Sequence, residues 1–320
     1  MSIIEKALDK SRAHKGQQED EAEVPGQTGE ATGAEARSAL GTDPTPATRS
    51  AEPPTSPTVA ETAPPVRHSQ KVNVDFAWLR KQGIIVPHDE RTGLTEEFRI
   101  MKRPILDNAF GRNSAMRVPN GRLVMITSSM PGEGKTFCTL NLALSMALEV
   151  DRTVLVVDAD VARPAIPHAL GIDCDRGLMD VLTEPDIDIP DVLLRTNIPN
   201  LSVIPAGRPH GRSTEVLASQ AMVQLLHDLN TRYEDRIILF DSPPLLATSE
   251  PGVLATHMGQ IIMVVEAERT PRSSVERAME QLQSCDVVLT TLNKSTRLPG
   301  MGGYGGYYAR GSYGSSTYGQ

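Results

Sequence analysis

The chain has 320 residues, 22% of them charged, and a formal net charge of −8 at pH 7. This acidic balance lacks the basic footprint of a general nucleic-acid binder, so we expect no nucleic-acid partner. The three cysteines, at positions 138, 174 and 285, have no metal-ligand spacing, which favours a reducing compartment. Neither an apolar run of about 18 residues nor a secretory signal is present, so we expect a cytoplasmic protein.

The N-terminal region divides into a short apolar segment and a longer polar one. Residues 1–11 would place four apolar side chains on one face of a short helix: Ile3, Ile4, Ala7 and Leu8. Such a short helix either frays or serves as a docking peptide. Residues 12–70 are rich in Ala, Glu, Pro, Thr, Ser and Gly and contain almost no large apolar side chains. This stretch has too little apolar surface to offset its chain entropy, so we predict a disordered linker.

Residues 71–117 form a second section, with scattered apolar anchors that include the only tryptophan. A helix is predicted from Leu94 to Arg103, where Pro104 should end it. Three charged residues recur in this helix at a spacing of three: Glu96, Arg99 and Lys102. Such a row is either a solvated surface of weak ion pairs or a contact between subunits. We therefore interpret 71–117 as a helical oligomerisation or docking segment.

Residues 118–298 alternate short apolar runs with helical stretches. The predicted strands are Arg122–Thr127, Thr153–Val157, Leu201–Pro205, Arg236–Phe240, Gln260–Val265 and Asp286–Thr291. Continuous apolar runs of this length suit strands that are buried on both faces of a parallel sheet. We predict an α/β domain of the P-loop NTPase type, with a doubly wound, mostly parallel sheet flanked by helices. Ligands of such sheets bind at the carboxyl ends of the strands.

A phosphate-binding loop follows the first of these strands. The segment from Ser128 to Thr136 reads Ser-Ser-Met-Pro-Gly-Glu-Gly-Lys-Thr and leads into an apolar helix, which is the context of a P-loop. Gly132 and Gly134 allow the backbone N–H groups to turn inward, and the helix N-terminus adds partial positive charge. Lys135 is placed to reach the β and γ phosphates of ATP, and the Thr136 hydroxyl is placed to ligate Mg²⁺.

Carboxylates end two other predicted strands. Asp158 and Asp160 stand two residues apart at one strand end and therefore point the same way, and Asp241 ends another strand. One such acid is readily explained as a strand-end cap. Three of them beside a P-loop favour a Mg²⁺ site instead.

The C-terminal segment, residues 299–320, is rich in glycine and tyrosine. It holds five of the six tyrosines of the protein: Tyr304, Tyr307, Tyr308, Tyr313 and Tyr318. Because glycine supports neither a helix nor a packed strand cheaply, we predict a flexible tail. Fully extended, the last twenty residues would reach roughly 65 Å, at about 3.3 Å per residue, which is enough to enter a neighbouring molecule.

Together these pieces resemble the bacterial tyrosine kinase (BY-kinase) family. In that family a P-loop is followed by an apolar motif that ends Asp-x-Asp-x-x-Arg, which matches 158–163. A third motif ends in Asp with Pro-Pro nearby, which matches 241–244. The similarity runs from about Thr92 to the end of the chain. The N-terminal Met-Ser-Ile-Ile-Glu-Lys-Ala-Leu, residues 96–106 and the trailing tyrosines also resemble the exosortase-associated tyrosine autokinases, which are encoded with exopolysaccharide export systems.

The resemblance implies an ATP-dependent tyrosine autokinase that phosphorylates tail tyrosines in trans and regulates exopolysaccharide biosynthesis and export. The implied catalytic residues are Lys135, Asp158, Asp160 and Asp241. Thr136 and Asp158 would organise Mg²⁺, with Asp241 acting through water, and Asp158 or Asp160 would accept the tyrosine proton. The residues implied to bind ATP are Ser129, which replaces the first glycine of the standard P-loop pattern, Met130, Pro131, Gly132, Glu133, Gly134, Lys135, Thr136, Phe137 and Arg163.

The resemblance also implies subunit contacts and partners. Glu96, Arg99 and Lys102 match the Glu-x-x-Arg-x-x-Arg contact motif of the family, but with Lys in the last place, where the planar fork of Arg is missing. The expected partners are further copies of the chain in a ring-like homo-oligomer, a membrane chain-length-determinant or polysaccharide co-polymerase protein, and a phosphotyrosine phosphatase. The membrane protein would hold the chain at the inner face of the cell membrane.

Two other functions fit part of the pattern. A Min- or Par-type ATPase switch shares the P-loop, but such proteins carry a signature lysine where this chain has Met130. An ATP-gated scaffold would use the tail only for docking. Asn293 and Lys294, after the last predicted strand, are weak candidates for adenine contacts. The chain has neither a His-Arg-Asp catalytic loop nor Asp-Phe-Gly, which excludes a kinase of the eukaryotic type.

Overall fold

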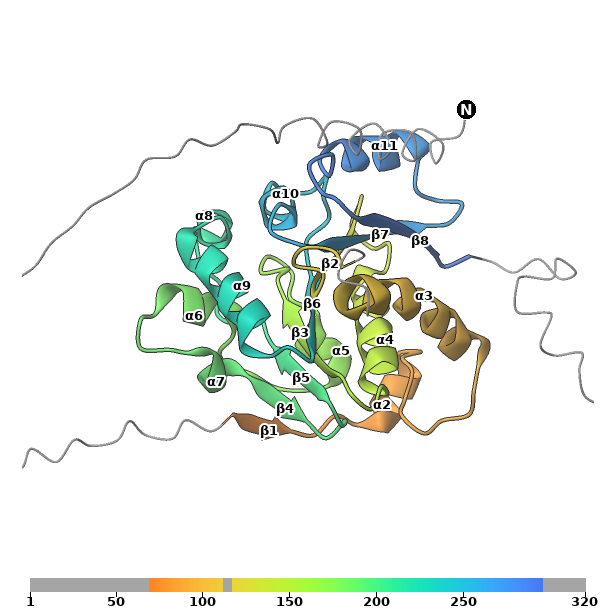
Figure 1. Cartoon of the computed structure of the whole chain (residues 1–320), viewed down its shortest axis with the longest axis horizontal. Coiled ribbons are helices and arrows are strands. Elements are labelled where there is room, and N and C mark those ends of the chain that lie inside the picture. The colour runs from red at the N-terminus through yellow and green to blue at the C-terminus, as the bar shows by residue number, and fades with distance from the viewer. Residues whose placement is uncertain (1–68, 112–116, 296–320) are drawn as a thin grey trace, which may run out of the picture. The chain divides into compact units, whose positions relative to one another are not determined.

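The computed structural model describes residues 69–111 and 117–295, and within these ranges the chain forms an α/β domain around one sheet (Figure 1). Its eight strands lie in the order β1-β4-β5-β3-β6-β2-β7-β8. The strands are β1 (Gln70–Val72), β2 (Leu123–Ser128), β3 (Thr153–Asp158), β4 (Leu194–Thr196), β5 (Leu201–Ile204), β6 (Arg236–Asp241), β7 (Gln260–Glu266) and β8 (Val288–Asn293). The strand that leads into the P-loop, β2, lies between β6 and β7.

The sheet is mostly parallel, as the apolar runs predict. All neighbouring strands pair in parallel except β4 and β5, which are antiparallel. In the β3–β6 pair, Asp158 is the direct partner of Asp241. The register therefore places two of the predicted site acids side by side at one edge of the sheet.

Helices cover both faces of the sheet (Figure 1). One face carries α2 (Phe76–Lys81), α3 (Gly93–Phe110), α4 (Lys135–Ala147) and α5 (Ile166–Leu170). The other carries α6 (Leu178–Thr183), α7 (Ile189–Val192), α8 (Ser213–Leu217), α9 (Gln220–Arg232), α10 (Glu250–Ala255) and α11 (Arg272–Glu280). Successive residues of β2 alternate between the two faces: Val124 and Ile126 pack on the first, Leu123 and Met125 on the second. The two hydrophobic layers thus share the central strands.

Two short strands were not predicted from the sequence. Both β1 and β4 have three residues, and their burial is mixed rather than continuous. Because Gln70 belongs to β1, the linker predicted to run to residue 70 ends before that residue. The segment 71–117 is not set apart from the α/β domain predicted for 118–298 either. Leu79 and Ile105 lie in the same hydrophobic cluster as Leu140 of α4, since this segment covers one face of the sheet.

The predicted end of a helix at Pro104 is wrong. Helix α3 begins after the capping residue Thr92 and continues through Pro104 to Phe110. An internal proline costs roughly 3 kcal/mol, because it has no N–H for the helical hydrogen bond and its ring clashes with the carbonyl four residues earlier. Residues beyond it offset that cost by burial, since Ile105 is fully buried and Ala109 nearly so. Packing against the sheet layer therefore outweighs the local preference of the sequence.

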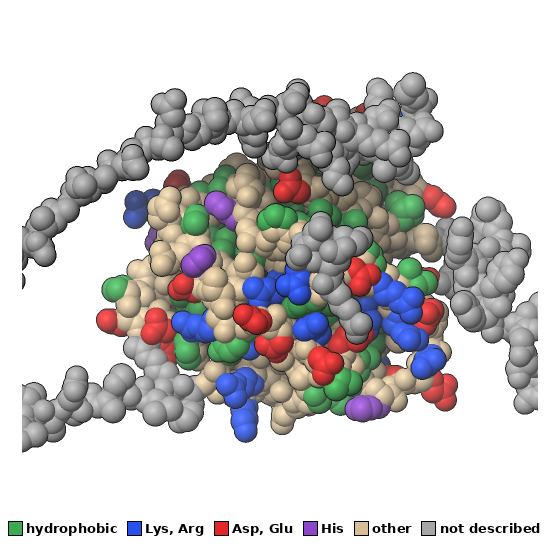
Figure 2. Space-filling model, viewed as in Figure 1, with side chains coloured by type: hydrophobic (Ala, Val, Ile, Leu, Met, Phe, Trp, Pro, Cys, Tyr) green, Lys and Arg blue, Asp and Glu red, His purple; other side chains and the backbone are tan. Residues whose placement is uncertain are grey.

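The charged side chains of this domain are mixed in sign. Figure 2 shows lysine and arginine side chains intermingled with acidic ones over the region where α3 lies in Figure 1.

None of the helices within 69–111 and 117–295 has the length and apolar content needed to cross a bilayer. The predicted N-terminal helix, nearly all of the predicted linker and the tyrosine tail lie outside the described residues.

Substitution on the two sides of α3 tests whether this helix belongs to the core. Ile105→Ala should lower the free energy of unfolding by about 2–5 kcal/mol, because a fully buried side chain is truncated. Ile100→Ala, on the same helix but 59% exposed, should change it by less than about 0.5 kcal/mol. Urea unfolding measures both. Equal effects would mean that α3 does not pack as described.

Candidate active site

The P-loop spans the turn between β2 and α4. Gly132 and Gly134 have φ values of 88° and 97°, in the left-handed region that favours glycine. A Cβ on Gly134 would also lie 2.0 Å from Asn293 Nδ2, so only glycine fits there. No side chain caps the N-terminus of α4. The first N–H groups of a 13-residue helix are thus available to an anion, which is the geometry of a phosphate site.

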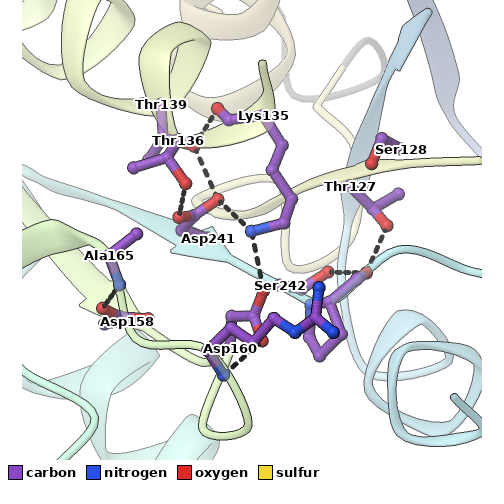
Figure 3. A network of polar contacts seen from close by, with 12 residues as sticks. Thr127, Ser128, Lys135, Thr136, Thr139, Asp158, Asp160, Ala165, Asp241 and Ser242 are labelled. Carbon is purple, nitrogen blue, oxygen red and sulfur yellow. Dashed lines mark hydrogen bonds and ion pairs between the residues drawn. The ribbon is translucent and has the colours of Figure 1, made fainter. Parts of the chain in front are cut away.

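Lys135, the first residue of α4, points at the carboxylates (Figure 3). Its Nζ lies 2.8 Å from Asp160 Oδ2 and 3.7 Å from Asp241 Oδ1. Burial alone would lower the pKa of Lys135, but Asp241 and Asp160 outweigh it and raise the pKa. The side chain is therefore a firmly protonated cation beside the loop.

The carboxylate of Asp241 accepts hydrogen bonds from hydroxyl groups of α4. Thr136 Oγ1 donates to Asp241 Oδ2 at 2.6 Å, and Thr139 Oγ1 lies 3.4 Å from Asp241 Oδ1 (Figure 3). Burial raises the pKa of this carboxyl, and the neighbouring Lys135 and Thr136 partly offset the shift. Sequence reasoning missed Thr139. Its spacing of three from Thr136 puts both hydroxyls on one side of the helix and is the signal that indicates it.

Asp158 lies buried beside this group. Its Oδ2 accepts the N–H groups of Ala165 and Ile166, both at 3.0 Å, while its Oδ1 has no hydrogen-bond partner among the described residues. Burial, and then repulsion by Asp241, raises the pKa of Asp158 to about 7. A buried carboxylate oxygen without a partner normally needs a cation or a proton.

These residues fit Mg²⁺. The Asp158 Oδ1 atom, the carboxylate of its sheet partner Asp241 and the Thr136 hydroxyl are oxygen donors of the kind that this ion prefers. Within the described residues no group of three or more His, Cys, Asp or Glu forms a ready-made metal site. Mg²⁺ commonly takes one or two carboxylates from a protein and completes its shell with water and phosphate oxygens.

Other predicted ATP-binding residues lie in different settings. Arg163 is exposed, and its backbone N–H donates to Asp160 Oδ1 at 3.1 Å, which orients that carboxylate. The ring of Phe137 packs edge-on against Phe98 of α3 at a centroid distance of 6.3 Å. Only its backbone N–H is therefore placed for a phosphate. Ser129 is fully buried at the start of the loop.

The side chain of Glu133 points into the protein. It is buried, and its Oε2 accepts the backbone N–H of Met130 at 2.7 Å. The Nδ2 of Asn293, a candidate adenine contact, donates to the backbone oxygen of Glu133 at 2.8 Å. Both residues hold the loop in shape in this structure, a role that the sequence did not suggest.

The row Glu96, Arg99 and Lys102 does not share one face. Arg99 Nη1 pairs with Glu96 Oε2 at 3.0 Å, and both side chains are exposed. Lys102 is buried: its Nζ pairs with Glu149 at 2.5 Å and donates to the Ser145 carbonyl at 2.7 Å. Each step of three residues falls about 60° short of a full helical turn, so Lys102 turns away from Glu96. The shared face is therefore a wrong prediction, because Lys102 is directed into its own chain. A subunit contact through this motif stays a prediction, and Glu96 and Arg99 are its exposed members.

A family model and several known proteins match this chain. The family described as an AAA domain matches residues 121–295. The EpsB protein of Ralstonia nicotianae is 34% identical over 209 residues, which cover 63% of this chain and 27% of EpsB. Tyrosine-protein kinase YwqD of Bacillus subtilis is 30% identical over 162 residues, which cover 51% of this chain and 67% of YwqD. The chain thus spans about a quarter of the length of EpsB.

A solved kinase domain resembles this chain in both sequence and structure. The VpsO kinase domain is 31% identical to this chain with a TM-score of 0.52, and the match covers 62% of this chain and 96% of that domain.

The buried acid predicts a pH dependence of stability. Folding raises the pKa of Asp158 from 3.8 to about 7. Between these two pH values Asp158 therefore keeps its proton in the folded state but has lost it in the unfolded state. The metal-free protein should therefore lose stability as pH rises through this window, by up to about 1.4 kcal/mol per pH unit. Asp158→Asn should remove this part of the slope, and Asp173→Asn, which removes an exposed acid, should not.

Urea unfolding at several pH values between 4 and 8, at constant ionic strength, measures the effect. If the difference in stability between wild type and Asp158→Asn stays constant across the range, the assignment to Asp158 is wrong.

Proposed function

The chain belongs to the bacterial tyrosine-protein kinase family, and from this premise we propose that it is an ATP-dependent tyrosine autokinase. The single observation that supports it best is the group formed by Lys135, Asp160 and Asp241 beside an uncapped helix N-terminus. This group offers one cation, Lys135, for the phosphates and one carboxylate, Asp160, that the cation can release. The acceptors are the tail tyrosines 304, 307, 308, 313 and 318.

Nucleotide binding would rearrange the ion pairs of the site. The P-loop N–H groups and the N-terminus of α4 receive the phosphates. Lys135 leaves Asp160 and swings to the β and γ phosphates, because a highly charged anion is a stronger partner than one carboxylate. That movement removes the cation from Asp160 and leaves its carboxylate free to accept a proton.

Transfer then needs one bond to form and one to break. The phenol oxygen of a tail tyrosine attacks the γ-phosphorus while the bond to the β–γ bridging oxygen breaks, so that ADP leaves. The phenol proton passes to Asp160 or Asp158, since a phenol with a pKa near 10 is mostly neutral at pH 7. When bound, Mg²⁺ supplies positive charge to the phosphate oxygens, and Thr136, Asp158 and Asp241 are the residues that would hold it.

The proposal extends to assembly and partners. Each chain would phosphorylate the tail of a neighbour in a ring-like homo-oligomer, with Glu96 and Arg99 of α3 at the contact. Each phosphorylation adds about −1.5 to −2 charges to an already acidic protein, so that tails repel one another and the ring loosens. A phosphatase would reverse the change. A membrane-bound polysaccharide co-polymerase is the proposed partner that holds the chain at the inner face of the membrane, and export of an exopolysaccharide is the proposed process.

Mixing two tagged variants tests the reaction and its direction. Replacement of all five tail tyrosines by Phe should nearly abolish phosphotyrosine, whereas Tyr233→Phe, which alters the 41% exposed tyrosine of the folded domain, should not. Lys135→Met should also abolish self-labelling, because the cation for the phosphates is lost. The five-Phe protein keeps its catalytic residues but lacks acceptors, and the Lys135→Met protein keeps its acceptors but lacks the catalytic cation. When the two are mixed with ATP and Mg²⁺, phosphate should appear on the tail of the Lys135→Met protein. Mass spectrometry that finds no phosphotyrosine in that tail would contradict transfer in trans.

The subunit contact predicts a second result. Arg99→Ala and Glu96→Ala should each weaken self-association at least several-fold and slow labelling in trans, because the exposed ion pair of α3 would be lost from the interface. Arg103→Ala removes an exposed cation from the same helix and serves as the matched control. Light scattering with and without ATP gives the oligomeric state. Identical behaviour of all three variants would return this pair to an ordinary surface role.

A further inference from the structure

Side chains from the ends of β7 and β8, together with Glu133 of the loop itself, hold the P-loop. Glu133 lies in the middle of the loop, yet its side chain is only 2% exposed. One carboxylate oxygen accepts the Met130 N–H at 2.7 Å, and the other accepts the hydroxyl of Thr270, in the turn between β7 and α11. Thr270 Oγ1 in turn accepts the N–H of Glu266 at 3.2 Å. The carboxylate therefore bridges two parts of the loop and ties them to the end of β7.

Side chains at the end of β8 hold the same loop by donating hydrogen bonds to the backbone oxygens of the loop. Asn293 Nδ2 donates to the Glu133 carbonyl at 2.8 Å, and Lys294 Nζ donates to the Gly132 carbonyl at 2.6 Å. Two successive carbonyls of the loop thus point to the strand end. These contacts join residues that are about 160 positions apart in the chain.

Lys294 is held in an unusual conformation to make this contact. Its φ of 57° lies in the left-handed region, which a lysine adopts only where its surroundings enforce it. The Nζ also pairs with Glu266 Oε2 at 3.1 Å, and Glu266 pairs with Arg269 at 3.3 Å. Burial acts to raise the pKa of Glu266, but Lys294 and Arg269 hold it below its usual range. Glu266 is therefore an anion that anchors Lys294 at the loop.

We propose that Glu133, Thr270, Asn293 and Lys294 form a P-loop clamp that positions the loop for phosphates before nucleotide arrives. In a trans peptide the carbonyl and the N–H point in opposite directions. Because the clamp draws the carbonyls of Gly132 and Glu133 to one side, the N–H groups of Glu133 and Gly134 are aimed at the other, towards the interior of the loop. The four side chains act through the backbone and are positioning residues.

The clamp lowers the cost of binding in a specific way. A glycine-containing loop that is free to rotate its peptide units must lose that freedom when phosphate binds. The clamp supplies the order in advance, so its loss should weaken nucleotide binding more than it slows the transfer step. The inference rests on the proposed nucleotide site, but not on the proposed transfer to tyrosine.

The test measures ADP affinity by calorimetry, together with KM for ATP and kcat of the full-length protein. Glu133→Ala and Lys294→Met should each raise the Kd for ADP and the KM for ATP about tenfold or more, with a much smaller change in kcat. Glu133→Gln and Lys294→Arg keep hydrogen-bonding groups in place and should recover most of the affinity. Arg269→Met is the matched control, because it removes the other cation on Glu266 without contacting the loop.

Three outcomes separate the clamp from simpler roles. Unchanged ADP affinity in folded Glu133→Ala and Lys294→Met would overturn the proposal, and so would an equal loss of affinity in Arg269→Met. If either clamp variant fails to fold, Thr270→Val, which removes only one hydroxyl, must still raise the Kd for ADP at an unchanged melting temperature, or the proposal fails. A wild-type protein that binds ADP with these dependences but forms no phosphotyrosine would contradict the kinase function and support the clamp.

Discussion

The contact between Lys135 and the carboxylates at the ends of β3 and β6 is the interaction on which the site depends. The sheet register puts Asp158 directly beside Asp241, and both side chains are completely buried. Two neighbouring buried acids are costly unless a cation or a proton compensates them. Lys135 provides that cation from the first turn of α4, so the position of the loop and that of the strand ends are mutually dependent. A shift of α4 would leave the acids uncompensated.

Lys135 cannot form close ion pairs with the carboxylates and with the phosphates at the same time. When Lys135 turns towards a nucleotide, the acids lose positive charge, while the phosphates bring at least three negative charges close to them. The site then requires another cation, and Asp158 Oδ1, which has no hydrogen-bond partner among the described residues, is an oxygen that such a cation would satisfy. Nucleotide and Mg²⁺ binding are therefore expected to be coupled, because each compensates for a charge that the other displaces.

Much of this arrangement could be predicted from the sequence because it follows from local patterns. The buried strands appear as continuous apolar runs, so β2, β3 and β6 were placed to within a residue. Local patterns failed where tertiary packing decides. Pro104 lies inside a helix because residues beyond it are buried, and β4 is too short and too mixed to stand out. From the sequence, Glu133 is a P-loop residue expected near phosphate. The orientation of its side chain is set by Thr270, which lies 137 positions away, so no local spacing in the sequence reveals it.

The strands on the two sides of β2 have separate roles. Strands β3 and β6 supply the acids, and the ends of β7 and β8 fix the loop that would carry the phosphates. The chain continues from Lys294 into the segment that carries the proposed acceptors, with Tyr304 ten residues on and Tyr318 24 residues on. Measured from that anchor, even an extended chain reaches only about 35 Å at Tyr304 but about 80 Å at Tyr318. For the proposed transfer in trans, the distal tyrosines therefore have the longer maximum reach from Lys294.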